Sequence, residues 1–80
     1  MHQPPTTFHV DGAVIRRRRM AAGVGLPDLA KRAGISRRYL SHIENGTRSH
    51  MGPALYLRLR TALGATENEL LVTEERTPKE

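Results

Sequence analysis

The sequence contains no cysteine and no tryptophan, and only one phenylalanine and two tyrosines among its 80 residues. Without cysteine, neither disulfide bonds nor thiolate metal sites can stabilise the fold. With so few aromatic residues, the core must be aliphatic. No apolar run approaches the roughly 18 residues that cross a membrane. The N-terminal MHQPPTTFHV also lacks the basic-then-apolar order of a signal peptide. We therefore expect one small cytoplasmic domain with no membrane association.

The residue groupings that enzymes use are also missing. There is no nucleophile–base pair, no carboxylate pair and no set of residues at metal-ligand spacing. His2 and His9 could bind a metal in principle, but no cysteine or spaced acidic residue would complete the site. A domain of this size buries only about 60–65% of its unfolded surface, which leaves no room for a deep cleft. We expect no enzymatic activity, no cofactor and no metal.

Charge is abundant and unevenly distributed. The chain carries 13 basic and 8 acidic residues, a net charge of +5. Residues 1–64 hold eleven basic and three acidic side chains, a balance of +8, whereas residues 65–80 hold two basic and five acidic ones, a balance of −3. A basic body is typical of proteins that bind polyanions, although a solvated basic surface has the same composition.

The pattern of apolar residues predicts five short helices. They cover residues 11–22, the stretch from Pro27 to Gly34, residues 36–44, residues 53–63, and a last helix capped by Thr66. No segment alternates with period two, so strands are not expected. Four consecutive arginines at 16–19 must spread around the first helix, so one or two approach the core. We divide the chain into a flexible arm at 1–10, a domain at 11–72 and a charged tail at 73–80.

Residues 26–44, LPDLAKRAGISRRYLSHIE, have the pattern of a helix-turn-helix. Pro27 suits the first turn of a helix. Gly34 suits the turn that follows, because glycine reaches the left-handed conformation without steric cost. Ser36 is a strong N-cap for the second helix. That helix has an apolar face of Tyr39, Leu40 and Ile43, and its other face is polar and basic.

The stretch LAKRAGISRRYLSHIENG, within residues 15–71, resembles the Cro and phage-repressor type of helix-turn-helix domain, the lambda-repressor-like Xre family. The shared pattern is Leu-Ala, three residues, Gly, an aliphatic residue, Ser, and a closing Ile-Glu-x-Gly. The resemblance implies an all-α, compact five-helix fold with a central helix-turn-helix. It also implies a partly buried ion pair between Arg19 and Glu44. A bare carboxylate at the end of a helix opposes the helix dipole, so Glu44 needs a cationic partner.

A helix-turn-helix places its second helix in the major groove of duplex DNA. We therefore expect a sequence-specific transcription regulator, a repressor, that reads DNA with helix 36–44. The expected base contacts are Arg37, Arg38, Ser41 and His42. The expected phosphate contacts are Arg16, Arg17, Asn45, Thr47 and Arg48.

The sequence departs from the family pattern at three positions. Leu26 stands where the family often has a glutamine that contacts phosphate. Arg18 and Arg60 replace the usual leucine and alanine, and their long stems can carry the charge outward.

Two further expectations concern partners. One such domain covers half a site, so we expect a homodimer on a palindromic sequence. Its candidate surface is Leu57 with residues 70–72, although Leu70 is better suited to the core. The alternative function is an antitoxin or interaction adaptor of the same fold, which would bind a protein through the acidic, leucine-bearing end at residues 67–75.

Overall fold

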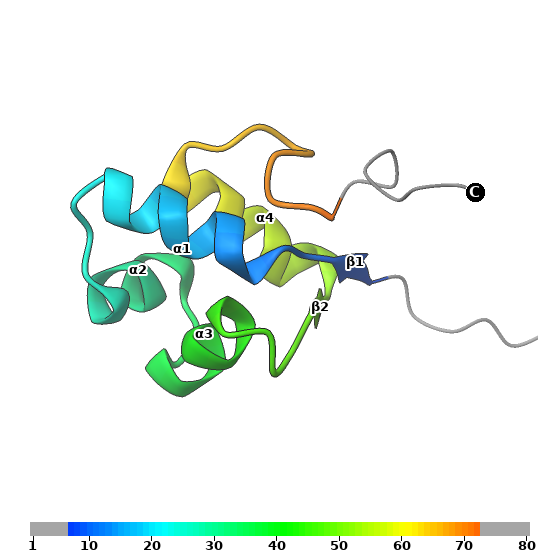
Figure 1. Cartoon of the computed structure of the whole chain (residues 1–80), viewed down its shortest axis with the longest axis horizontal. Helices are drawn as coiled ribbons and strands as arrows, with labels where there is room; N and C mark the ends of the chain where they lie inside the picture. The colour runs from blue at the N-terminus through cyan, green and yellow to red at the C-terminus, as the bar shows by residue number, and fades with distance from the viewer. Residues whose placement is uncertain (1–6, 73–80) are drawn as a thin grey trace, which may run out of the picture.

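The computed structural model describes residues 7–72, and within them four helices and two short strands. The helices are α1 (Gly12–Ala21), α2 (Leu26–Ala33), α3 (Arg37–Glu44) and α4 (Pro53–Leu63), and the strands are β1 (Phe8–His9) and β2 (His50–Met51). Figure 1 shows α2 and α3 on the same side of α1. Helix α2 lies near one end of α1, and the two strands lie beyond its other end. No helix within residues 7–72 is long and apolar enough to cross a membrane.

The core is aliphatic, as the scarcity of aromatic residues predicts. Among the described residues, Tyr56 is the one buried aromatic side chain, and its exposed fraction is 4%. The largest fully buried side chains come from all four helices, β2 and the C-terminal segment: Ile15, Leu29, Leu40, Ile43, Met51, Leu59 and Leu70. Leu57, which the sequence predicts at the surface, is half exposed.

The predicted helix ends are confirmed at the caps. The Asp11 carboxylate accepts hydrogen bonds from the first turn of α1, and the Ser36 hydroxyl accepts one from the Tyr39 amide at 3.0 Å. Gly34 ends α2 with φ of +71°, in the left-handed region that favours glycine. These three residues fix where α1 and α3 begin and where α2 ends.

The prediction of a fifth helix is wrong, because the described residues form four helices. The Thr66 amide donates to Glu69 Oε1 at 3.0 Å, as at the start of a capped helix, but residues 67–70 make turns and no helix follows. Leu71 instead bridges Val10, and the Leu70 carbonyl accepts the Asp11 amide at 2.8 Å. Pairing with the N-terminal segment therefore overrides the local helical signal.

The expectation of no strands is also wrong. Strand β1 pairs with β2 in an antiparallel register that sets Phe8 opposite Met51 and His9 opposite His50. Two-residue strands are too short to show a period-two pattern, and this pairing joins segments about forty residues apart. The expectation of a flexible arm at 1–10 therefore does not hold for residues 8–10, which pair with other segments. Residues 1–6 and the expected tail at 73–80 lie outside the described residues.

Candidate nucleic-acid interface

Helices α2 and α3 meet at a tight turn that sets the geometry of the candidate interface. The Ile35 amide donates to the Ala30 carbonyl at 3.0 Å, which closes the turn over the end of α2. Ala30 is only 1% exposed, and its small side chain lets the two helices approach closely. A larger side chain there would overpack the crossing. Leu40 and Ile43 are fully buried, so the opposite side of α3 faces outward.

The four predicted base-contacting residues lie together on that outward face. Arg37 and Arg38 are exposed, and Ser41 and His42 are half-buried one turn later. All four line one shallow depression together with Leu26 and Pro27 from the start of α2. Leu26, where the family often carries a polar phosphate contact, is therefore an apolar wall of this depression.

The loop after α3 is fixed to the end of the helix by its own hydrogen bonds. Asn45 Oδ1 accepts the Thr47 amide at 2.9 Å, and the Arg48 amide donates to the His42 carbonyl at 3.0 Å. The Arg48 guanidinium lies 5.7 Å from the centre of the Tyr39 ring, within cation–π range. Asn45, Thr47 and Arg48, three of the predicted phosphate contacts, are exposed along this loop.

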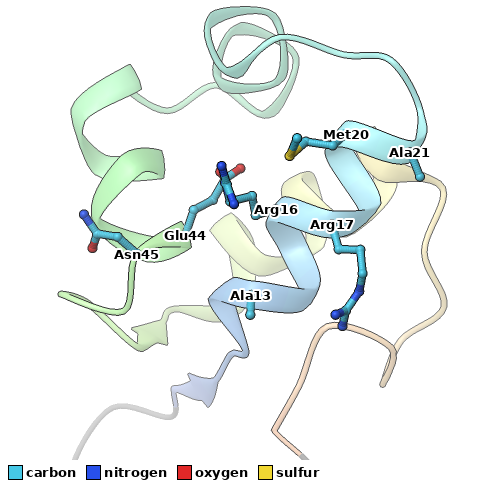
Figure 2. Close-up of a pocket in the computed structure, with 7 residues that line it drawn as sticks. All are labelled: Ala13, Arg16, Arg17, Met20, Ala21, Glu44 and Asn45. Atoms are coloured by element: carbon cyan, nitrogen blue, oxygen red, sulfur yellow. The ribbon is translucent and has the colours of Figure 1, made fainter.

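The two predicted phosphate contacts on α1 point in different directions. Arg16 and Arg17 are both exposed, and successive helix residues lie about 100° apart. Figure 2 shows the Arg16 side chain extending toward Glu44 at the end of α3, whereas the Arg17 side chain extends in another direction, although both line the same pocket. The structure therefore brings Arg16, but not the Arg17 guanidinium, toward the α3 side of the molecule.

Arg19 and Glu44 form a two-pronged ion pair between α1 and the last turn of α3. Arg19 Nε lies 2.7 Å from Glu44 Oε2 and Nη2 lies 3.0 Å from Oε1, with side chains 12% and 5% exposed. Arg19 Nη1 also donates to the Val24 carbonyl at 3.0 Å. The hydrogen bonds to Glu44 raise the pKa of Arg19, so Arg19 remains charged. The pair fixes the orientation of α3 relative to α1.

Two structural arginines were not assigned from the sequence. Arg18 Nη1 lies 2.6 Å from Glu69 Oε2, and Nη2 reaches the last carbonyls of α4 at 3.4 Å. Arg58 Nε donates to the Ala33 carbonyl at 3.0 Å, which satisfies the end of α2. The sequence feature that indicates a structural role for Arg18 is its presence at a position where the family usually has leucine. Arg58 contacts Ala33 on a different helix, and no spacing in the sequence indicates this contact.

The geometry agrees with comparisons against known proteins. The family of helix-turn-helix domains matches residues 12–71. This chain belongs to that family. The resemblance to Cro and phage-repressor type domains, and the all-α fold class, are thereby confirmed. In this helix-turn-helix domain, α2 and α3 are the two helices of the motif and Gly34 lies in the turn between them. A comparison with curated protein sequences found no match.

Several solved structures are similar to this domain. The restriction-modification controller protein C.AhdI from Aeromonas hydrophila is 33% identical, over 75% of this chain and 89% of its own, with a TM-score of 0.69. The clp gene regulator ClgR from Corynebacterium glutamicum is 36% identical, over 69% and 70%, with a TM-score of 0.62. The N-terminal DNA-binding domain of SinR from Bacillus subtilis is 27% identical, over 79% and 91%, with a TM-score of 0.71. Their names describe a controller protein, a gene regulator and a DNA-binding domain.

Proposed function

We propose that this protein is a transcription regulator that binds duplex DNA sequence-specifically, with α3 in the major groove. One observation carries the proposal: Arg37, Arg38, Ser41 and His42 gather on the outward face of a helix whose other face is fixed in the core. SinR, a similar protein, has been crystallised with DNA. Bound to a promoter, such a domain acts as a repressor by occluding it.

The two exposed arginines of α3 are the main base readers in this proposal. An arginine fork matches O6 and N7 of guanine, which is the commonest specific contact in the major groove. Ser41 and His42 lie one turn further along α3 and face the same depression. The site sequence is therefore expected to contain guanines opposite the start of α3.

Phosphate contacts on either side of α3 would hold the helix in register. The loop residues Asn45, Thr47 and Arg48 flank one side, and Arg16 extends toward the end of α3. Contacts to phosphate fix position and orientation but do not read sequence. Arg17, which points away, is expected to contribute only through its long-range charge.

One domain covers half a site, so we propose a homodimer on a palindromic sequence. A groove beside α4 supplies the candidate surface: it is lined by apolar side chains including Phe8 and half-exposed Leu57, and also by Arg60 and Glu67. Leu70 is fully buried in the core, so it is not part of this surface. Analytical ultracentrifugation should show two chains on a palindromic duplex. A monomer under these conditions would contradict the dimer.

The alternative is a protein-interaction role, as in an antitoxin or an adaptor. Its supporting observation is the same apolar groove around Leu57, which adjoins the C-terminal turn, and one similar structure is of SinR with the protein SinI. Tight binding to a protein partner, without salt-dependent DNA binding, would favour this alternative.

The test of DNA reading compares two charge-matched double variants. Arg37→Ala with Arg38→Ala removes both proposed readers, and Lys31→Ala with Arg32→Ala removes equal charge from exposed positions at the end of α2. Each arginine that reads a base is worth about 1–3 kcal/mol of discrimination. Fluorescence anisotropy should therefore show that the α3 variant loses its preference for the selected site over random duplex. The α2 variant should keep that preference, and equal losses in both would contradict base reading.

A further inference from the structure

His42 differs from the other polar residues on α3 in how its ring is buried. Nδ1 of His42 is buried and has no hydrogen-bond partner, and it is the one side-chain nitrogen or oxygen in this state within residues 7–72. The other ring nitrogen, Nε2, is neither buried nor bonded to a protein group. The ring therefore has one nitrogen turned inward and one left accessible.

The accessible side of the ring faces the proposed DNA surface. His42 lines the depression shared by Arg37 and Ser41 and also the neighbouring depression shared by Tyr39 and Arg48. It thus lies between the base-reading face of α3 and the loop that follows it. Arg38 lies one turn earlier and lines both depressions too.

The buried position of Nδ1 decides which nitrogen carries the hydrogen. A neutral imidazole has one N–H donor and one acceptor nitrogen. A buried N–H group that lacks an acceptor is rare and costs free energy, whereas a buried acceptor atom that lacks a donor is better tolerated. The burial of Nδ1 therefore favours the tautomer with hydrogen on Nε2, in which His42 presents a donor to its surroundings.

We propose that His42 is a specificity-determining donor that selects guanine at one position of the site. The inference rests on the proposed function. In the major groove, guanine offers the acceptors N7 and O6 with no donor, whereas cytosine offers an amino donor and adenine sets an amino donor beside N7. Thymine offers the single acceptor O4 beside its methyl group. A donor at Nε2 of His42, beside the donors of Arg38, therefore matches the two acceptors of guanine, exceeds the one acceptor of thymine, and meets an amino group on cytosine or adenine.

The first test reads the tautomer in the free protein. Long-range ¹H–¹⁵N NMR of the full chain at pH 8, where imidazoles are neutral, reports which ring nitrogen of His42 carries the hydrogen. The expected result is hydrogen on Nε2. Hydrogen on Nδ1 would overturn the proposal whether or not the protein binds DNA.

The second test uses two amide variants as probes of the ring nitrogens. The amide of His42→Gln reaches about as far as Nε2, and that of His42→Asn only as far as Nδ1. Glutamine can both donate and accept, which suits adenine. Selection from a random duplex pool should therefore give guanine at one position for the wild-type chain, a shift toward adenine for His42→Gln, and relaxed preference there for His42→Asn.

The outcomes separate this inference from the proposed function. If wild-type protein selects a site and His42→Gln leaves every position unchanged, His42 is not a base reader and only this inference fails. If the variants lose affinity equally for selected and random duplex, His42 contacts phosphate and the inference also fails. If no sequence is selected by the wild-type chain, the proposed function fails, and the role of His42 fails with it.

Discussion

Arg19 and Glu44 join α1 to the last turn of α3 through two parallel hydrogen bonds, of 2.7 and 3.0 Å, in a nearly buried setting. The pair sets the angle at which α3 is presented. Two observations support a structural role: both side chains are mostly buried, and Arg19 also binds the Val24 carbonyl.

Removing one partner of this pair should destabilise the fold strongly. Arg19→Ala leaves the Glu44 carboxylate buried without its counter-ion, which typically costs about 3–5 kcal/mol. Arg17→Ala is the matched control, since Arg17 is exposed on the same helix and surface changes stay within about 0.5 kcal/mol. Urea unfolding followed by circular dichroism measures both. A loss for Arg19→Ala no larger than that for the control would show that the pair contributes little.

Gly12 should tolerate no side chain, because the start of α1 lies directly against the end of α3. A Cβ added at Gly12 would clash with the Ile43 carbonyl oxygen and lie 2.8 Å from that of Glu44. Both obstacles are backbone atoms, so Gly12→Ala should cost about 1–3 kcal/mol or more. Gly52→Ala is the control, since nothing lies within 4 Å of its added Cβ. Equal unfolding midpoints for the two variants would contradict this close approach.

The parts of the fold that the sequence predicts are those set by local chemistry. Ser36 and Asp11 as caps, and Gly34 as a left-handed helix end, act within a few residues of themselves. The β1–β2 pairing and the loss of the fifth helix depend on contacts between segments far apart in the chain, such as Val10 with Leu71. No local pattern specifies such contacts, and in the 66–72 segment the local helical signal is overridden.

Tyr56 should make stability fall at high pH. Its hydroxyl donates to the Glu67 carbonyl at 2.7 Å, and burial raises the pKa of Tyr56 above the usual 10.0. Above that pH the unfolded chain releases the proton while the folded chain keeps it, so the stabilising effect is full below about pH 10 and declines above it. Urea unfolding of wild type and Tyr56→Phe from pH 7 to 11 should show a stability difference that is constant at first and then shrinks. A difference constant to pH 11 would contradict the expectation.

The candidate site was predictable to the extent that it lies on one helix. The positions of Arg37, Arg38, Ser41 and His42 follow from the period of α3 and the register of its apolar face. The divergence of Arg16 and Arg17 needs the orientation of α1 against α3, and the inward Nδ1 of His42 needs the packing around the ring. These features depend on how helices meet, which the periodicity of one helix does not specify.

The most direct test of the account is selection of bound sequences from a random duplex pool with the full chain. The account predicts one enriched motif with two-fold symmetry, half-sites about one helical turn apart, and guanines where the start of α3 enters the groove. It predicts that the motif is lost in the Arg37→Ala, Arg38→Ala variant. Salt-dependent binding with no enriched sequence, or an enriched motif unchanged in that variant, would contradict sequence reading by α3.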